Sequence, residues 1–174
     1  MMTLLSAALA IDAQRYGPDG TFTAVTSDSR AIAAGDLFVA IKGDHFDGHA
    51  FVADAIRQGA TGALVSQKFA AAHPELPLIA VADTRLGLGE LAAAWRSRFT
   101  LPLIGVTGSN GKTTVKEMCA AILRTQGGEV LATAGNLNND IGLPLTLLKL
   151  RDAHTSAVIE MGMNHAGEID YLTH

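Results

Sequence analysis

Ile104-Gly-Val-Thr-Gly-Ser-Asn-Gly-Lys-Thr-Thr114 separates an apolar run from a stretch with helical periodicity. A phosphate-binding loop typically has this order of elements: a strand, a glycine-rich loop, Lys-Thr and a helix. The glycines of such a loop adopt conformations that other residues avoid, so backbone N–H groups can point at phosphate oxygens. The helix adds its positive N-terminus. The sequence therefore predicts an ATP site formed by Thr107, Gly108, Ser109, Asn110, Gly111, Lys112, Thr113 and Thr114.

Two side chains of this loop have distinct expected roles. Lys112 is placed to reach the β- and γ-phosphates, and the Thr113 hydroxyl can ligate Mg²⁺ beside them. The loop departs from the usual G-x-x-x-x-G-K-[ST] pattern at Val106, because the nearest glycine, Gly105, comes one residue too early. A glycine-rich turn with a solvated lysine is the alternative interpretation. The position between strand and helix favours the phosphate site.

Short apolar runs alternate with helical stretches along the rest of the chain, which is typical of βα units and a largely parallel sheet. The predicted strands are Leu37–Ile41, Gly62–Val65, Leu78–Val81, Leu103–Thr107, Val130–Thr133 and Ala157–Met161. The predicted helices are Thr3–Ile11, His49–Gln58, Thr84–Arg98, Lys112–Gln126, a segment near Ile141–Leu150 and one that begins near Ala166. The fold class is therefore α/β.

The helix after the glycine-rich loop has an apolar stripe. Val115, Met118, Cys119 and Ile122 recur at the spacing of one helical face, so this face is expected to pack on the sheet. Cys119 lies on the stripe and is interpreted as a packed core thiol rather than a catalytic or metal-binding one.

A domain boundary is expected near residue 100. A long predicted helix ends there in Arg-Ser-Arg-Phe-Thr, and Pro102 precedes a new apolar strand. The expected domains are residues 1–100 and 101–174. The second part is shorter than a nucleotide-binding α/β domain requires, so we expect a truncated ATPase domain.

Composition limits the classes of function. Hydrophobic residues make up 48% and charged residues 17% of the 174 residues, which is typical of a globular protein. The 17 acidic residues outnumber the 13 basic ones, so no nucleic-acid partner is expected. No apolar run approaches the roughly 20 residues of a membrane span, so no membrane insertion is expected. A single cysteine suits a reducing compartment, and the expected location is cytoplasmic.

The loop Thr-Gly-Ser-Asn-Gly-Lys-Thr-Thr resembles that of the Mur ligases and the folylpolyglutamate synthases. These ATP-dependent enzymes activate a carboxylate as an acyl phosphate and join it to an amine. The resemblance to the Mur ligases extends over nearly the whole chain from about residue 20 onward. Besides the loop, it is carried by four segments: Ser27–Arg30, Gly35–His49, Asn136–Thr146 and Val158–Ile169.

The resemblance implies a small N-terminal α/β domain that binds a UDP-linked substrate, followed by the first part of a P-loop ATPase domain. It further implies a ligase of peptidoglycan-precursor synthesis that joins D-alanyl-D-alanine to UDP-N-acetylmuramoyl-tripeptide and is a monomer in its full-length form. The lysine that the family carries as a carbamate and its third domain have no match up to His174. The substrate contacts that the resemblance implies are Ser29, Arg30, Asp44, His45, Phe46, Asn138, Asn139, Asn164 and His165.

Glu160 follows an apolar run, so its carboxylate is expected near the carboxyl edge of the sheet, where ligands of open α/β folds bind. A carboxylate there suits Mg²⁺, and the resemblance points to the same role. The alternative is a capping or solvated glutamate. Lys112 and Glu160 are the expected catalytic residues, and Thr113 and Glu160 the expected metal ligands.

Other polar residues have structural alternatives. His165 could be a helix-capping or surface histidine, and the asparagines near residue 138 could serve turn geometry. The loop that contains Asp44, His45, Asp47 and His49 could suggest a zinc site, but two histidines without further Cys or His nearby do not fill a tetrahedral shell. The loop is therefore interpreted either as a structural loop or as one that lines the substrate.

Three alternatives to this function stay open: another Mur ligase, a folylpolyglutamate-type ligase, or a nucleotide-binding module without turnover. The early segments argue against the folate enzymes, which lack a UDP-binding domain. The 174-residue chain by itself is expected to be inactive.

Overall fold

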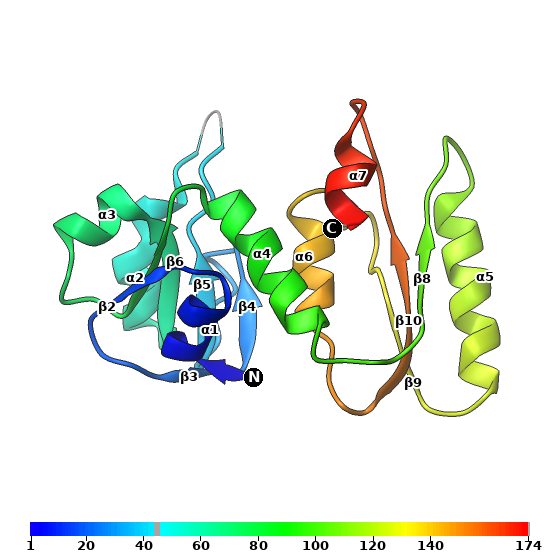
Figure 1. The fold of residues 1–174 in the computed structure, drawn as a ribbon, viewed down its shortest axis with the longest axis horizontal. Coiled ribbons are helices and arrows are strands. Elements are labelled where there is room, and N and C mark those ends of the chain that lie inside the picture. Colours follow the sequence, from blue (N-terminus) through cyan, green and yellow to red (C-terminus); the bar gives the residue numbers. More distant parts are fainter. Residues whose placement is uncertain (44–45, 174) are drawn as a thin grey trace. The chain divides into compact units, whose positions relative to one another are not determined.

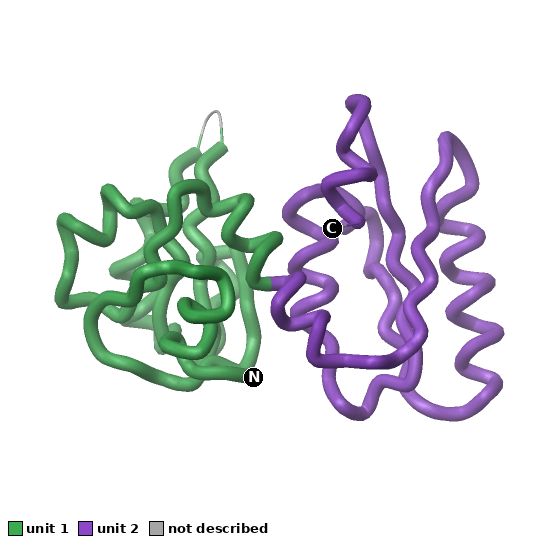
Figure 2. The backbone as a smooth tube through the Cα atoms, viewed as in Figure 1, with its two compact units in different colours: residues 1–91 green, residues 92–174 purple. Residues whose placement is uncertain are grey.

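The computed structural model describes residues 1–43 and 46–173. The chain forms two compact units, residues 1–91 and 92–174 (Figure 2). The division lies inside helix α4 (Thr84–Arg96), so the first turns of this helix belong to one unit and its last residues to the other. The boundary of independently folding domains near residue 100 stays a prediction.

The first unit is built on a five-stranded sheet of order β2-β7-β6-β5-β4. Strands β4 to β7 run parallel, and β2 pairs antiparallel with β7 at one edge. Every residue of β5 and β7 is buried, as expected for strands of a parallel sheet that is covered on both faces. The strand bounds are β2 Gln14–Tyr16, β4 Ala24–Thr26, β5 Asp36–Val39, β6 Gly62–Ser66 and β7 Leu78–Val81.

Four further helices belong to this unit: α1 (Leu4–Ala10), the 3₁₀ helix η1 (Gly48–Phe51), α2 (Val52–Arg57) and α3 (Gln67–Ala72). Helices α1 and α3 contact β7, and α2 contacts β6. A small two-stranded ribbon joins β1 (Met2–Thr3) to β3 (Thr21–Phe22). The core between sheet and helices consists of apolar side chains of different sizes, Phe38, Val52, Ala55, Val65 and Leu78 among them.

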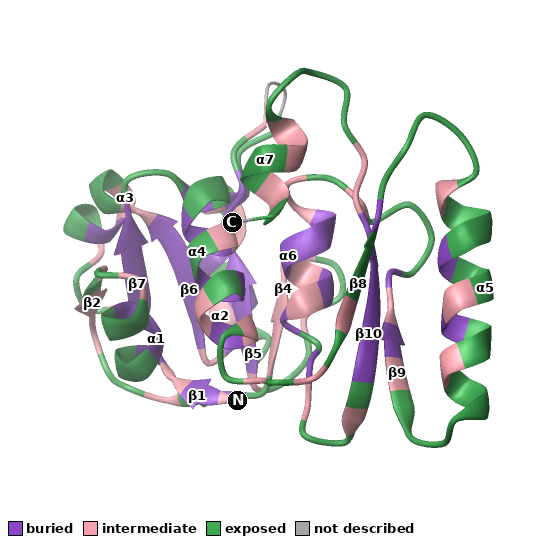
Figure 3. Cartoon of the chain, turned by 45° about the vertical axis from the view of Figure 1, so that its right-hand side comes forward, coloured by how far each residue is buried: buried purple, intermediate pink, exposed green. Residues whose placement is uncertain are grey.

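The second unit has a parallel three-stranded sheet of order β8-β10-β9 (Figure 1). The strands are β8 (Leu103–Val106), β9 (Glu129–Ala132) and β10 (His154–Glu160). Helices α5 (Lys112–Thr125) and α6 (Gly142–Leu147) lie against opposite faces of this sheet, and α7 (Glu168–Thr173) follows β10 (Figure 1). The central strand β10 is buried from Ser156 to Glu160 (Figure 3).

The structure confirms the α/β class and each of the six predicted strands, which differ from the observed ones by at most a few residues. The helix predicted over His49–Gln58 is divided into η1 and α2. Strands β1 to β4 and helix α3 were not predicted, because each is short and lacks the apolar periodicity on which the prediction depends.

The predicted packing face of α5 is wrong in part. Val115, Met118 and Ile122 are exposed, with 48%, 60% and 61% of their surface accessible. The helix instead contacts the sheet through the buried Lys116 and Ala120, flanked by the partly buried Cys119 (Figure 3). The packing face is therefore rotated from the most apolar face, and only Cys119 belongs to both.

Within the second unit, Trp95 near the end of α4 is buried. Its indole N–H donates a hydrogen bond to the carbonyl oxygen of Leu150 at 3.1 Å. The ring also lies edge-on to Phe99 and beneath the Arg98 guanidinium. Across the described residues, every helix is too short or too polar to cross a bilayer.

Candidate functional site

The loop between β8 and α5 has the backbone that a phosphate-binding loop needs. Residues 107–111 are exposed, and Gly108 and Gly111 have φ angles of +143° and +77°. Gly111 is the residue before the first turn of α5, and a side chain there would strain the backbone although open space surrounds it. The Lys112 ammonium donates to the carbonyl oxygen of Gly108 at 2.7 Å and so lies over its own loop.

Glu160 ends the central strand beside this loop. Its register partner is Val106, the last residue of β8. The carboxylate and the start of the loop therefore lie at the same edge of the sheet, where the parallel strands have their carboxyl ends. Only 2% of Glu160 is accessible to solvent. Oε1 accepts a hydrogen bond from Asn138 Nδ2 at 2.7 Å, whereas the buried Oε2 has no hydrogen-bond partner among the described residues.

Asn138 is held against Glu160 by a close approach of two loops. The N–H of Gly162 donates to the carbonyl oxygen of Asn138 at 2.8 Å. A Cβ atom at Gly162 would lie 2.9 Å from the side-chain amide carbon of Asn138, so a larger residue would displace that amide. Gly162 therefore permits the contact that fixes one oxygen of Glu160.

Two residues of this site were missed by the sequence analysis. Lys116 is completely buried, and its ammonium donates to the carbonyl oxygen of Thr133 at 2.7 Å and contacts Glu117 Oε1 at 2.8 Å. The buried Thr133 hydroxyl accepts the backbone N–H of Glu160 at 2.9 Å. The only signal in the sequence was a lysine one helical turn after Lys112, which by itself is typical of a solvated residue.

The remaining candidates of the second unit lie in exposed or capping positions. Thr113 and Thr114 are exposed in the first turn of α5. Asn139 Oδ1 accepts the N–H groups of Ile141 and Gly142, at 3.3 and 2.8 Å, where α6 begins. This contact matches the turn-forming alternative for the asparagine.

Asn164 and His165 interact with the helix that follows them. The carboxylate of Glu168 accepts the N–H of Asn164 at 2.6 Å and contacts His165 Nδ1 at 3.0 Å. The bond from the Asn164 N–H, more than the contacts with His165, holds the pKa of Glu168 below its usual range. Both residues thus have structural partners, and a substrate contact by either stays a prediction.

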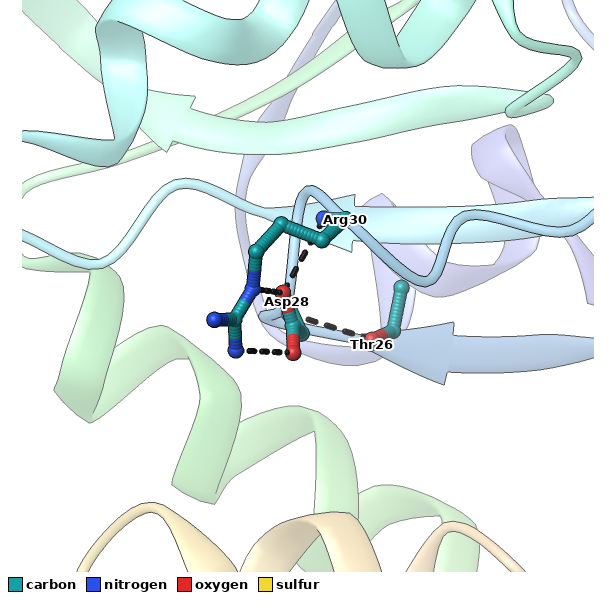
Figure 4. A network of polar contacts seen from close by, with 3 residues as sticks. All are labelled: Thr26, Asp28 and Arg30. Atoms are coloured by element: carbon teal, nitrogen blue, oxygen red, sulfur yellow. Dashed lines mark hydrogen bonds and ion pairs between the residues drawn. The ribbon is translucent and has the colours of Figure 1, made fainter.

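In the first unit, Arg30 is fixed by Asp28 in the turn after β4 (Figure 4). Arg30 Nε and Nη2 donate to the two carboxylate oxygens at 2.9 and 2.8 Å, and the Arg30 N–H adds a bond of 3.0 Å. The Thr26 hydroxyl accepts the Asp28 N–H at 3.1 Å. The bonds from Arg30, those of its side chain above all, lower the pKa of Asp28 to about 2. Ser29 is half-buried between the paired residues.

Phe46 is half-exposed and stacks on Phe51, with ring centroids 5.3 Å apart. The candidates Asp44 and His45 lie outside the described residues. Both ring nitrogens of His49 are engaged, because Nδ1 contacts Asp47 Oδ1 at 2.6 Å and Nε2 accepts the N–H of Ser66 at 3.0 Å.

These contacts leave His49 no free nitrogen for zinc. Within residues 1–43 and 46–173, His, Cys, Asp and Glu side chains do not gather in groups of three or more that could hold a metal ion.

Two parts of the chain match domains of one family. Residues 21–96 match the Mur ligase family catalytic domain, and residues 106–174 match the Mur ligase middle domain. The chain belongs to the Mur ligase family. The second match begins at the last residue of β8 and includes the loop of residues 107–111, Lys116, Thr133, Asn138 and Glu160.

Relatives within the Mur ligase family share a specific name. The UDP-N-acetylmuramoyl-tripeptide–D-alanyl-D-alanine ligase of Escherichia coli is 49% identical over 168 residues, which is 97% of this chain and 36% of the relative. The crystal structure of MurF from Acinetobacter baumannii is 40% identical with a TM-score of 0.87, and covers 99% of this chain and 38% of that one.

A MurF ligase of Thermotoga maritima solved in complex with ADP is 34% identical with a TM-score of 0.73, covering 86% of this chain and 34% of that one. The chain thus spans little more than a third of the length of these relatives.

Proposed function

We propose that this chain supplies the nucleotide loop and a Mg²⁺ ligand of an ATP-dependent ligase that joins D-alanyl-D-alanine to UDP-N-acetylmuramoyl-tripeptide. The observation that carries the proposal is the pairing, at one sheet edge, of the Gly108–Lys112 loop with the buried carboxylate of Glu160. The names of the relatives support the substrates, and the ADP complex of one of them supports nucleotide binding.

The donor set at this edge fits a magnesium ion. Burying a carboxylate oxygen without a hydrogen-bond partner costs free energy, and a cation bound to Glu160 Oε2 would compensate for this cost. The Thr113 hydroxyl lies in the exposed first turn of α5 and provides a second oxygen of the kind that Mg²⁺ accepts. When bound, the ion would supply Lewis-acid stabilisation of phosphate charge.

The reaction we propose has two steps. The terminal carboxylate of the tripeptide attacks the γ-phosphorus of ATP, which forms an acyl phosphate and releases ADP. The amine of D-alanyl-D-alanine then attacks the acyl carbon, forms the amide and releases phosphate and a proton. Lys112 would offset the charge on the transferring phosphoryl group by leaving Gly108 O for phosphate oxygens, while residues 107–111 donate backbone N–H groups.

The substrate contacts follow from the same family. We propose that Ser29, Arg30, Asp44, His45 and Phe46 bind the UDP part. Arg30 keeps Nη1 outside its bonds to Asp28, which suits an acceptor such as a carbonyl or diphosphate oxygen. The single cysteine agrees with a cytoplasmic site of action.

We propose that the rest of the substrate is contacted by Asn139, Asn164 and His165. These contacts would use polar atoms other than those in the hydrogen bonds described above. For Asn138 the bond to Glu160 favours a different role, that of orienting the metal ligand.

Substitution Lys112→Ala tests the nucleotide loop. In the full-length protein we expect the Kd for ADP to rise about tenfold or more, because a charge-assisted contact contributes about 1.5–3 kcal/mol. Calorimetry measures the Kd, and Lys149→Ala, at an exposed lysine of the same unit, is the control. An unchanged Kd in Lys112→Ala would contradict the proposal.

A further inference from the structure

Lys116 places a positive charge in the interior of the second unit. Its side chain is completely buried on the face of α5 that contacts the sheet, whereas most lysines extend into solvent. An apolar residue of similar volume would fill this position without the penalty of desolvating a charge. The ammonium therefore needs an explanation beyond filling the core.

The partners of the ammonium lie along one path toward Glu160. Lys116 Nζ donates to the carbonyl oxygen of Thr133, the residue that follows β9. The same threonine accepts the backbone N–H of Glu160 with its hydroxyl and donates its own N–H to Val158 O at 3.1 Å. Thr133 thus links the buried ammonium to the strand that ends in Glu160.

The other end of this path is the phosphate loop. Lys116 comes one helical turn after Lys112, on the helix whose first residue closes the loop. The bond to Thr133 therefore ties the first turns of α5 to the ends of β9 and β10. The second ammonium contact, to Glu117, involves a side chain that is 59% exposed and leads away from Glu160 toward solvent.

We propose that Lys116 is a positioning residue for the metal ligand Glu160 and acts through Thr133. The inference rests on the proposed role of Glu160. Asn138 holds Oε1 of this carboxylate from one side, and Thr133 holds its backbone from the other, so that the unpartnered Oε2 is left for the cation. Lys116 fixes Thr133 relative to the helix that carries the nucleotide loop.

The test measures binding of Mn²⁺, used as the probe ion, by electron paramagnetic resonance in the full-length protein with ADP present. Lys116→Met removes the ammonium and keeps an aliphatic side chain. Thr133→Val replaces the hydroxyl with a methyl group and leaves the Lys116 bond to the carbonyl. Because outer partners of metal ligands typically contribute 10–100-fold in affinity, we expect each variant to raise the Kd for Mn²⁺ by about this factor.

A second measurement separates positioning from general damage to the site. Calorimetry with ADP in the absence of metal should give the wild-type Kd in both variants, because the phosphate loop itself is unchanged. In the double variant, the Kd for Mn²⁺ should not exceed the higher Kd of the two single variants, because both changes interrupt the same path. Lys149→Met is the matched control and should change neither Kd.

The outcomes distinguish this inference from the proposed function. If the wild-type protein binds no Mn²⁺ in the presence of ADP, the metal site itself is refuted. If wild type binds Mn²⁺ and Thr133→Val, checked for native folding by circular dichroism, binds it equally well, the positioning role is overturned and the metal site stands. An equal loss of metal-free ADP affinity in Lys116→Met and Thr133→Val would also overturn it, because both would then act on the nucleotide loop.

Discussion

At the scale of single residues, the geometry of Arg30 is set by a carboxylate two positions away. The guanidinium and the carboxylate of Asp28 meet through two parallel bonds, which fixes the plane of the guanidinium. The Arg30 side chain is 88% exposed and that of Asp28 is 43% exposed, and ion pairs open to solvent in this way contribute little to stability. The pair therefore matters more for where Arg30 points than for holding the fold together.

The pH dependence of Asp28 tests this pair. Because its pKa in the folded chain is about 2, below the ordinary 3.8, the pair favours the folded state above pH 3.8, and this contribution is lost as the pH falls through 2. We expect Arg30→Gln to return the pKa of Asp28 toward 3.8, measured by carboxyl ¹³C chemical shifts. Arg57→Gln, at the separate Asp54 pair, should leave Asp28 unchanged. An Asp28 pKa that stays near 2 without Arg30 would disprove the pairing in solution.

Whether a candidate site residue could be predicted from the sequence depended on whether its contacts are local in the chain. Lys112 and the loop glycines are close in sequence, so spacing alone defines their arrangement. Glu160 was predictable because a strand end determines where the next carboxylate lies. Lys116 and Thr133 interact across 17 positions, and their contact depends on how β9 and α5 meet in space. No local pattern indicates such a contact.

At the scale of elements, α5 shows that burial follows the neighbours of a helix and not its apolar periodicity alone. The sheet beneath it has only three strands, and β8 forms one edge, where Ile104 is 39% exposed. Ala120 therefore faces Val106 and Val158 in the core, whereas Met118 and Ile122 have no cover among the described residues. The residues of the stripe are apolar, but the sheet covers a neighbouring face of α5, so the predicted packing of the stripe is wrong except at Cys119.

Two substitutions in α5 of the 174-residue chain distinguish the faces. Ala120→Leu should lower the free energy of unfolding by about 1–3 kcal/mol, because the added atoms have no room in a packed core. Met118→Ala, two positions away but exposed, should change it by less than about 0.5 kcal/mol. Urea denaturation followed by circular dichroism measures both. Equal destabilisation would mean that the stripe predicted from periodicity is buried after all.

At the scale of the whole molecule, the two units show which features of the fold can be predicted from the alternation of apolar runs with helical stretches. It predicted the class and every central strand, since buried parallel strands are continuous apolar runs. It did not predict the order of the strands in the second sheet, in which β10 lies between β8 and β9. Strand order depends on contacts between distant segments, and sequence periodicity contains no information about it.

The fraction of the relatives' length that this chain covers leads to a prediction about the activity of residues 1–174 by themselves. Acyl transfer requires the carboxylate, the γ-phosphate and the amine in near-attack geometry, and this positioning can supply about 7–11 kcal/mol of the barrier. Residues 1–174 correspond to little more than a third of the relatives named as ligases. Lys112, Thr113 and Glu160 lie close to one end of the sheet, and the roles proposed for them are to bind phosphate and a cation and not the incoming amine.

We therefore expect a polypeptide limited to residues 1–174 to release no phosphate when given ATP, Mg²⁺, UDP-N-acetylmuramoyl-tripeptide and D-alanyl-D-alanine. A coupled phosphate-release assay measures this, with the full-length protein as the positive control and Lys112→Ala in the short polypeptide as the background. Turnover that depends on both substrates and disappears in Lys112→Ala would contradict the expectation. Such a result would mean that these residues alone hold the carboxylate and the amine against the γ-phosphate, so the amine-binding groups would have to be sought within residues 1–174.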